Sequence, residues 1–99
     1  MDYRLVTTRE ALNDLLDIAT FIATGSPNRA RSFVAELKLR MENSLRSFPN
    51  AGRSYGDVRI LSVGNYLAVY RVDVTAETVT IILVTEGHRD WQDLLDDRL

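Results

Sequence analysis

The sequence predicts an α+β domain with the order β-α-α-β-β-β, in which an antiparallel helix hairpin packs on one face of a small, mainly antiparallel four-stranded sheet. Two observations support this prediction. Apolar residues recur at three-and-four spacing between residues 8 and 48, and β-branched and aromatic residues then dominate from residue 57 to residue 86. A short helical tail is expected to follow. At 99 residues, the chain is predicted to form one domain, residues 1–99.

The composition excludes several classes of protein. A hydrophobic share of 45% with 26% charged residues is typical of a folded globular domain. The chain has no cysteine and a single histidine, His88, so disulfides, thiolate metal sites and histidine-rich metal sites are excluded, and no cofactor is expected. A net charge of −2 argues against direct nucleic-acid binding by the chain alone. Without a signal-peptide pattern or a membrane-spanning stretch, the protein is expected to be cytoplasmic.

The helix boundaries are marked by capping residues. Thr7 and Glu10 fit a capping box, which predicts that the first helix begins near Thr8. Gly25 is expected to end it, and Ser26-Pro27 then supplies an N-cap followed by proline at the first helical position. The short link between the helices predicts an antiparallel hairpin. Before them, residues 3–6 are expected to form a short strand, and residues 50–56 after them a loop.

Three strands are predicted in residues 57–63, 66–74 and 78–86. Gly64-Asn65 is a two-residue hairpin signal that places Val63 opposite Tyr66. A three-residue turn at 75–77 is expected to join the last two strands. This register gives an aliphatic face with Val58, Ile60, Leu67, Val69, Ile81 and Leu83. It also gives a mixed face with Arg59, Leu61, Tyr66, Ala68, Tyr70, Ile82, Val84 and Glu86.

The helix hairpin is expected to cover the aliphatic face and to leave the mixed face to a partner or to the tail. In the tail, Trp91, Leu94 and Leu95 are predicted to pack inward. An ordinary solvated outer face is the alternative reading of the mixed face.

Several short motifs, taken in order, resemble those of one protein family. They are Ser26-Pro27 with Ala30, Phe48-Pro49, Gly52-Arg53, Val58-Arg59, Tyr66, Tyr70-Arg71, the strand IILV, and Gly87 with Arg89 and Asp90. With them, the chain resembles the ParE branch of the RelE/ParE toxin superfamily over essentially its whole length. One departure is Glu86, because the family often has histidine before this glycine, whereas here His88 follows it.

The resemblance implies a toxin of a type II toxin–antitoxin module, of the kind that stabilises plasmids or chromosomes. It would form a hetero-oligomer with a ParD-like or other antitoxin. ParE-like members inhibit DNA gyrase by binding, which is the function expected here, whereas RelE-like members cleave messenger RNA on the ribosome. A non-toxic relic that only binds its antitoxin is a further alternative.

Enzymatic activity is left open, and binding is favoured over catalysis. A ribonuclease needs a base, an acid and cations for the phosphate. The candidates are His88, Arg59, Arg89, Tyr70 and Glu86. By family standards the set is incomplete, because Arg53 is the only basic residue in the loop before the sheet. His88 has the alternative of a plain tail residue bonded to backbone or water.

Two binding surfaces are predicted. The antitoxin, or a strand that it adds to an exposed sheet edge, is expected to contact Arg59, Leu61, Tyr66, Tyr70, Arg71 and Val84. The target is expected to contact Arg53, Arg89 and Trp91, since arginine and tryptophan dominate binding hot spots. The alternative for Trp91 is that it caps the core beneath the tail.

Overall fold

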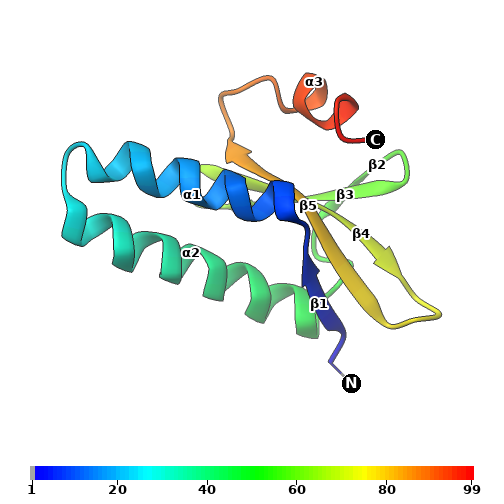
Figure 1. The fold of residues 1–99 in the computed structure, drawn as a ribbon. Helices are drawn as coiled ribbons and strands as arrows, with labels where there is room; N and C mark the ends of the chain where they lie inside the picture. The colour runs from blue at the N-terminus through cyan, green and yellow to red at the C-terminus, as the bar shows by residue number, and fades with distance from the viewer. Residues whose placement is uncertain (1) are drawn as a thin grey trace.

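The computed structural model describes residues 2–99, which form one sheet and three helices (Figure 1). Figure 1 shows α1 and α2 side by side, with α3 above them and the β4–β5 hairpin projecting away from the helices. None of the helices in residues 2–99 is long and apolar enough to cross a membrane. The elements are β1 (Arg4–Thr7), α1 (Arg9–Ala23), α2 (Pro27–Ser47), β2 (Arg53–Tyr55), β3 (Val58–Val63), β4 (Tyr66–Asp73), β5 (Thr78–Glu86) and α3 (Trp91–Asp96).

The sheet has five strands in the order β1-β5-β4-β3-β2, rather than the four that the sequence predicts. The extra strand is β2, which lies inside the predicted loop 50–56 and pairs antiparallel with β3. Gly56, at φ +59°, closes the tight turn between them. A strand of three exposed residues has no alternating pattern, so its sequence is that of a loop. As predicted, the sheet is mainly antiparallel; among the strands of the described residues, β1 alone pairs parallel, with β5.

The helix caps agree with the sequence to within one residue. Ser26 caps α2, and its side chain accepts a hydrogen bond from the amide of Arg29 at 3.3 Å. The cap of α1 is Thr8 rather than Thr7, because the Thr8 hydroxyl accepts from the Ala11 amide at 3.1 Å. Thr7 is instead the last residue of β1.

The register of the β3–β4 hairpin is confirmed. Val63 lies opposite Tyr66, and Arg59 lies opposite Tyr70. Gly64 has φ +60°, and Asn65 does not adopt a positive φ, as in a turn that needs glycine only at its first central position.

The β4–β5 hairpin differs from the prediction in its turn and in one strand. The turn has four residues, 74–77, because Asp73 pairs with Thr78. A β-bulge then makes Ile82 an extra residue of β5, so that Tyr70 pairs with Ile81 and the register from residue 83 onward is the predicted one. As a consequence, Ile81 and Ile82 exchange the faces expected for them.

Helices cover both faces of the sheet, and the prediction of which face α1 and α2 cover is wrong. Ala68, Tyr70 and Val84 of the mixed face pack with α1 and α2 in one core cluster. Val63, Val79 and Ile81 join them on that face, which makes it apolar enough for two helices. The aliphatic face forms a second cluster, which α3 closes with Trp91 and Leu95 as predicted for the tail; the members from the sheet are Val58, Ile60, Leu67, Val69, Ile82 and Leu83.

Candidate functional site: a cleft over the edge of β5

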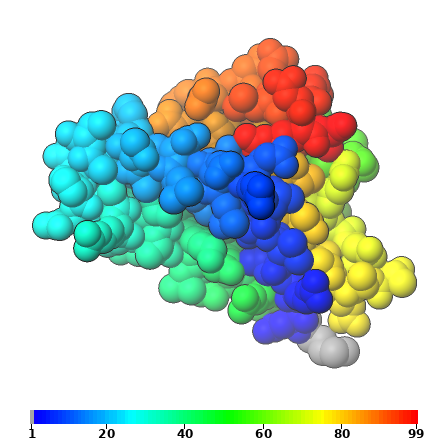
Figure 2. Space-filling model, viewed as in Figure 1, coloured from blue at the N-terminus to red at the C-terminus, as the bar shows by residue number. Residues whose placement is uncertain are grey.

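A cleft of about 400 Å³ lies between α1 and the C-terminal segment, over the edge of β5. Figure 2 shows the C-terminal segment, orange to red, lying along the upper side of α1, in blue. The cleft has apolar and charged residues on its walls. They are Asp14, Asp17, Ile18 and Phe21 of α1, Leu83, Val84, Thr85 and Glu86 of β5, Tyr66, Arg89, Leu94 and Arg98.

The edge of β5 is uncovered here because β1 is short. The parallel pairing ends with Thr7 opposite Ile81, and the chain then turns into α1. The Thr8 amide, just after β1, makes the last backbone hydrogen bond to this edge and donates to the Ile81 carbonyl at 3.0 Å. Beyond this point, no strand within residues 2–99 lies beside the outer edge of β5.

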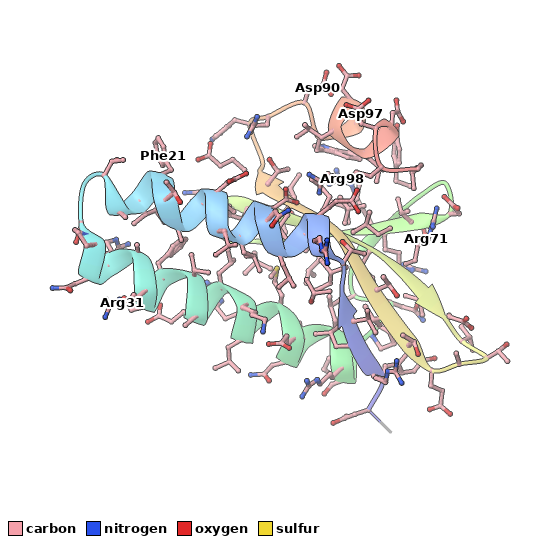
Figure 3. The ribbon with its side chains drawn as sticks, viewed as in Figure 1. Phe21, Arg31, Arg71, Asp90, Asp97 and Arg98 are labelled. Atoms are coloured by element: carbon pink, nitrogen blue, oxygen red, sulfur yellow. The ribbon has the colours of Figure 1, made fainter. Side chains whose placement is uncertain are left out.

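An ion pair between Asp14 and Arg98, which is labelled in Figure 3, replaces part of the missing strand. The Arg98 guanidinium donates to both carboxylate oxygens of Asp14, at 2.5 and 2.7 Å, and to the Ile82 carbonyl at 3.0 Å. Asp14 also accepts from the Val84 amide at 2.9 Å. The hydrogen bond to Asp14 raises the pKa of Arg98. The pair therefore joins α1 and the C-terminal segment to the strand edge.

Tyr70 and Arg59, two of the residues proposed for ribonuclease chemistry, bind the chain's own loop. The buried Tyr70 hydroxyl donates to the Pro49 carbonyl at 2.8 Å and accepts from the Gly52 amide at 2.9 Å. Burial raises its pKa. Arg59 donates to the carbonyls of Gly52 at 2.7 Å and Asn50 at 3.4 Å. These contacts hold the connection between α2 and β2.

The other three proposed ribonuclease residues lie at the opposite end of the sheet. Glu86 pairs with Tyr66, four residues from Tyr70 along β4, or roughly 13 Å at the rise of a strand. His88 and Arg89 follow in the exposed link to α3. The structure therefore does not bring the five residues into one site. In residues 2–99, no three His, Cys, Asp or Glu side chains are grouped so that they could hold a metal ion.

The predicted antitoxin-binding residues divide into buried and accessible ones. Tyr70 and Val84 are buried under the helices, with 0% and 2% of their surface exposed. Arg59 and Leu61 are half-buried. Arg71 is exposed, and its Nη2 lies 3.4 Å from Oδ2 of Asp57.

Tyr66 is the accessible member of this set that borders the cleft. It is half-buried, and its ring packs against Phe33 at 5.4 Å between centroids. Burial and the neighbouring Glu86 carboxylate raise its pKa.

Trp91 caps the second core cluster, as in the alternative reading of the sequence. Its side chain is 7% exposed and packs edge-on against Tyr55, with 4.9 Å between the ring centroids. Arg53 and Arg89, the other predicted target contacts, are exposed.

The sequence analysis did not identify Asp14, Arg98 or Phe21 as site residues. Asp14 is a polar residue of the first helix whose partner is 84 positions away, so no local pattern connects them. Phe21 is 71% exposed and is labelled in Figure 3 on the side of α1 that faces the C-terminal segment. An aromatic residue outside the apolar stripe of the helix was the one available signal.

Comparison with solved structures shows that the fold is that of the RelE/ParE toxins. The toxin–antitoxin complex RelBE2 from Mycobacterium tuberculosis gives a TM-score of 0.71 at 21% identity, covering 90% of this chain and 95% of that one. The chromosomal ParDE system from P. aeruginosa gives 0.69 at 22%, covering 85% and 95%. A mutant of E. coli RelE in the free state gives 0.68 at 20%, covering 100% of both chains.

The family model described as ParE toxin of type II toxin-antitoxin system, parDE, matches residues 5–91. The chain therefore belongs to the ParE toxin family. No curated protein matches the sequence.

Proposed function

We propose that this toxin inhibits DNA gyrase by binding, in the cytoplasm, and that a ParD-like antitoxin neutralises it in a hetero-oligomer. The observation that carries the gyrase proposal is that the side chains of Tyr70 and Arg59 form hydrogen bonds to the chain's own backbone. The Tyr70 hydroxyl and Nη1 of Arg59 are hydrogen-bonded to the Pro49–Gly52 connection, so these groups are not free to act on RNA. A general acid or base must reach its proton within about 3 Å, and Glu86 and His88 lie at the other end of the sheet.

The surface proposed for the target is the side of the sheet that carries α3. Arg53 pairs with Ile60, whose side chain packs beneath α3, so the exposed Arg53 shares that side. Arg89 is exposed immediately before α3. Trp91 and Tyr55 fix α3 on the sheet and thereby set the position of the arginines. We expect the two arginines to contact gyrase and Trp91 to support them from within.

Supercoiling by purified gyrase, run beside a translation and mRNA-cleavage assay, tests the target. The wild-type toxin is expected to inhibit supercoiling, and an Arg53→Ala/Arg89→Ala variant to need at least about tenfold more protein. Arg31→Ala, an exposed arginine on α2, is the matched control and is expected to retain full inhibition. His88→Ala should also inhibit normally. Cleavage of mRNA that disappears in His88→Ala, with gyrase unaffected by the wild type, would reject the proposal in favour of the ribonuclease.

Co-expression tests the antitoxin. The toxin produced alone is expected to be lethal or poorly soluble, and soluble when the product of the neighbouring gene is produced with it. A harmless, freely soluble chain that no adjacent gene product binds would contradict this part of the proposal.

A further inference from the structure

The outer face of the helix hairpin, on the side of α1 and α2 turned away from the sheet, carries exposed apolar side chains. Leu16 of α1 is 64% exposed, and Leu39 of α2 is 57% exposed. Figure 2 shows α1, in blue, and α2, in cyan to green, with no other element in front of them. An open groove of about 560 Å³ lies between the two helices, and its apolar lining consists of Ala19, Ala23, Pro27, Ala30, Val34 and Ala35. The described part of the chain therefore leaves this apolar area uncovered.

On α1, a cation and an anion lie at the two ends of one exposed row. Arg9, Asn13 and Asp17 are spaced by four residues, which places them along one side of a helix. All three are exposed, and at about 100° per residue this side is opposite to the buried Ala11 and Leu15. Arg9 and Asp17 take part in no ion pair within residues 2–99. Both charges are therefore available to a partner.

The exposed row on α2 has apolar residues in its middle and opposite charges toward its ends. Ala35 and Leu39 are exposed and lie about one turn apart. Arg31 comes about one turn earlier and forms no ion pair within the described residues. Glu42 comes three residues after Leu39, and its two ion pairs within α2 are long, at 3.7 and 3.9 Å. Exposed pairs of this kind contribute little, so Glu42 can also pair with a partner.

The two rows lie level with each other across the hairpin. α1 ends at Ala23, α2 begins at Pro27, and the two helices run antiparallel (Figure 1). Asn13, ten residues before the end of α1, is therefore level with Leu37, ten residues after the start of α2. The middle of each row lies at this level, so one axis can pass through the middle of both.

A two-fold axis at this level, perpendicular to the helices, pairs unlike groups of two copies of the chain. On α1 it places Arg9 opposite Asp17 of the second copy. On α2 it places Leu39 against Ala35 of the second copy, a large side chain against a small one. Arg31 comes within one residue of Glu42 of the second copy. The outer face is thus complementary to itself in charge and in side-chain size.

We propose that two copies of this chain form a dimer through the outer face of the hairpin, with α1 antiparallel to α1 and α2 antiparallel to α2 of the second copy. The inference goes beyond inhibition of gyrase and neutralisation by an antitoxin. The dimer leaves the surface proposed for gyrase free, because α1 and α2 pack on one face of the sheet and α3 on the other.

The size of the outer face sets the expected strength of the dimer. α1 and α2, with 15 and 21 residues, are about 22 and 31 Å long, and two packed helices are about 20 Å wide. The two copies together would bury roughly 900–1,200 Å², which is at the lower limit for specific interfaces. We therefore expect a dimer with a Kd in the micromolar range.

Sedimentation equilibrium of the purified toxin tests the place of the contact. The wild type is expected to dimerise, and Leu39→Asp to raise the Kd of the dimer at least tenfold, because it sets a charge against an apolar side chain. Phe21→Asp is the matched control: Phe21 is 71% exposed and lines the cleft on another side of α1, so the Kd should change less than threefold. Equal effects of the two substitutions, or the opposite ranking, would overturn the inference.

Exchange of charges tests the antiparallel arrangement. Arg9→Asp is expected to raise the Kd of the dimer at least threefold, because it places two anions opposite each other. The double variant Arg9→Asp/Asp17→Arg restores the pair in reversed order and should return the Kd to within about twofold of the wild type. A double variant that dimerises no better than Arg9→Asp alone would overturn the arrangement.

Two further outcomes separate the inference from the proposed function. A wild-type toxin that stays monomeric up to about 1 mM would overturn the dimer. If Leu39→Asp then weakens antitoxin binding, the outer face is a contact for the antitoxin instead of a second copy. Inhibition of gyrase by Leu39→Asp is expected to equal that of the wild type, so a failed dimer leaves the gyrase proposal intact.

Discussion

Replacing Arg98 with methionine is expected to destabilise the protein more than the loss of any exposed ion pair. The change removes two hydrogen bonds to Asp14 and one to the Ile82 carbonyl. Asp14 then keeps only the Val84 amide as a donor. Its carboxylate stays largely buried, because the side chains of Arg98 and Asp14 are 17% and 13% exposed.

The magnitude follows from these contacts. Breaking a fully buried pair from one side costs roughly 3–5 kcal/mol, and a single hydrogen bond to a charged group contributes about 1.5–3 kcal/mol. Because some solvent reaches this pair, we expect Arg98→Met to lower the free energy of unfolding by about 2–3 kcal/mol. At about 4–8 °C per kcal/mol for a domain of this size, the Tm should fall by roughly 8–24 °C.

Urea unfolding followed by the fluorescence of Trp91, the single tryptophan, measures the change. Lys38→Met is the matched control: its partner Glu42 lies 3.9 Å away on an exposed helix surface, and the loss should be within about 0.5 kcal/mol. Arg98→Lys keeps the charge without the two-pronged contact and should fall between them. An Arg98→Met stability that matches the Lys38→Met control would show that the reasoning about the strand edge is wrong.

Three further substitutions probe the core and the loop that it holds. Tyr70→Phe should cost about 1–3 kcal/mol, because it leaves the buried Gly52 amide without its acceptor. Burial holds the pKa of Tyr70 above its usual 10.0, so its contribution to the free energy of unfolding is full below pH 10 and is lost as the pH rises above 10. Above pH 10 the urea midpoint of Tyr70→Phe should therefore fall less steeply with pH than that of the wild type. Tyr66→Phe is the comparison, because the pKa of Tyr66 is also raised. Gly52→Ala should cost about 1–3 kcal/mol by calorimetry, because its Cβ would lie 2.7 Å from the Ile60 carbonyl oxygen. Trp91→Ala should cost about 3–5 kcal/mol in urea unfolding followed by circular dichroism, and no loss would contradict its place in the core.

Much of the fold was predictable because it depends on local signals. Ser26 and Pro27 mark the start of α2, and Gly64 fixes the β3–β4 register through its positive φ. The four-residue turn and the bulge at Ile82 carry no such signal. Each shifts the register by one residue, in opposite directions, so the prediction is correct from residue 83 onward and wrong for Ile81 and Ile82.

The candidate site was less predictable, because it depends on contacts between distant parts of the chain. Glu86 and Arg89 were singled out from a family resemblance, and both line the cleft. Tyr70 and Arg59 share the predicted face of Glu86, but the same register places Glu86 opposite Tyr66, four residues along β4 from Tyr70, so sharing a face does not bring these residues into one site. Asp14 reads as an ordinary solvated residue until Arg98 is placed beside it.

The separation of 84 positions between Asp14 and Arg98 has a consequence for the nascent chain. At a translation rate of about 5–20 residues per second, roughly 4–17 s pass between the synthesis of the two residues. β1 cannot pair until β5 has been synthesised, because Arg4 pairs with Thr78, which lies 74 positions further along the chain. During this interval α1 and α2 can form, but the sheet that covers their apolar stripe cannot, so a growing chain exposes this stripe to chaperones and proteases before the protein can act on anything.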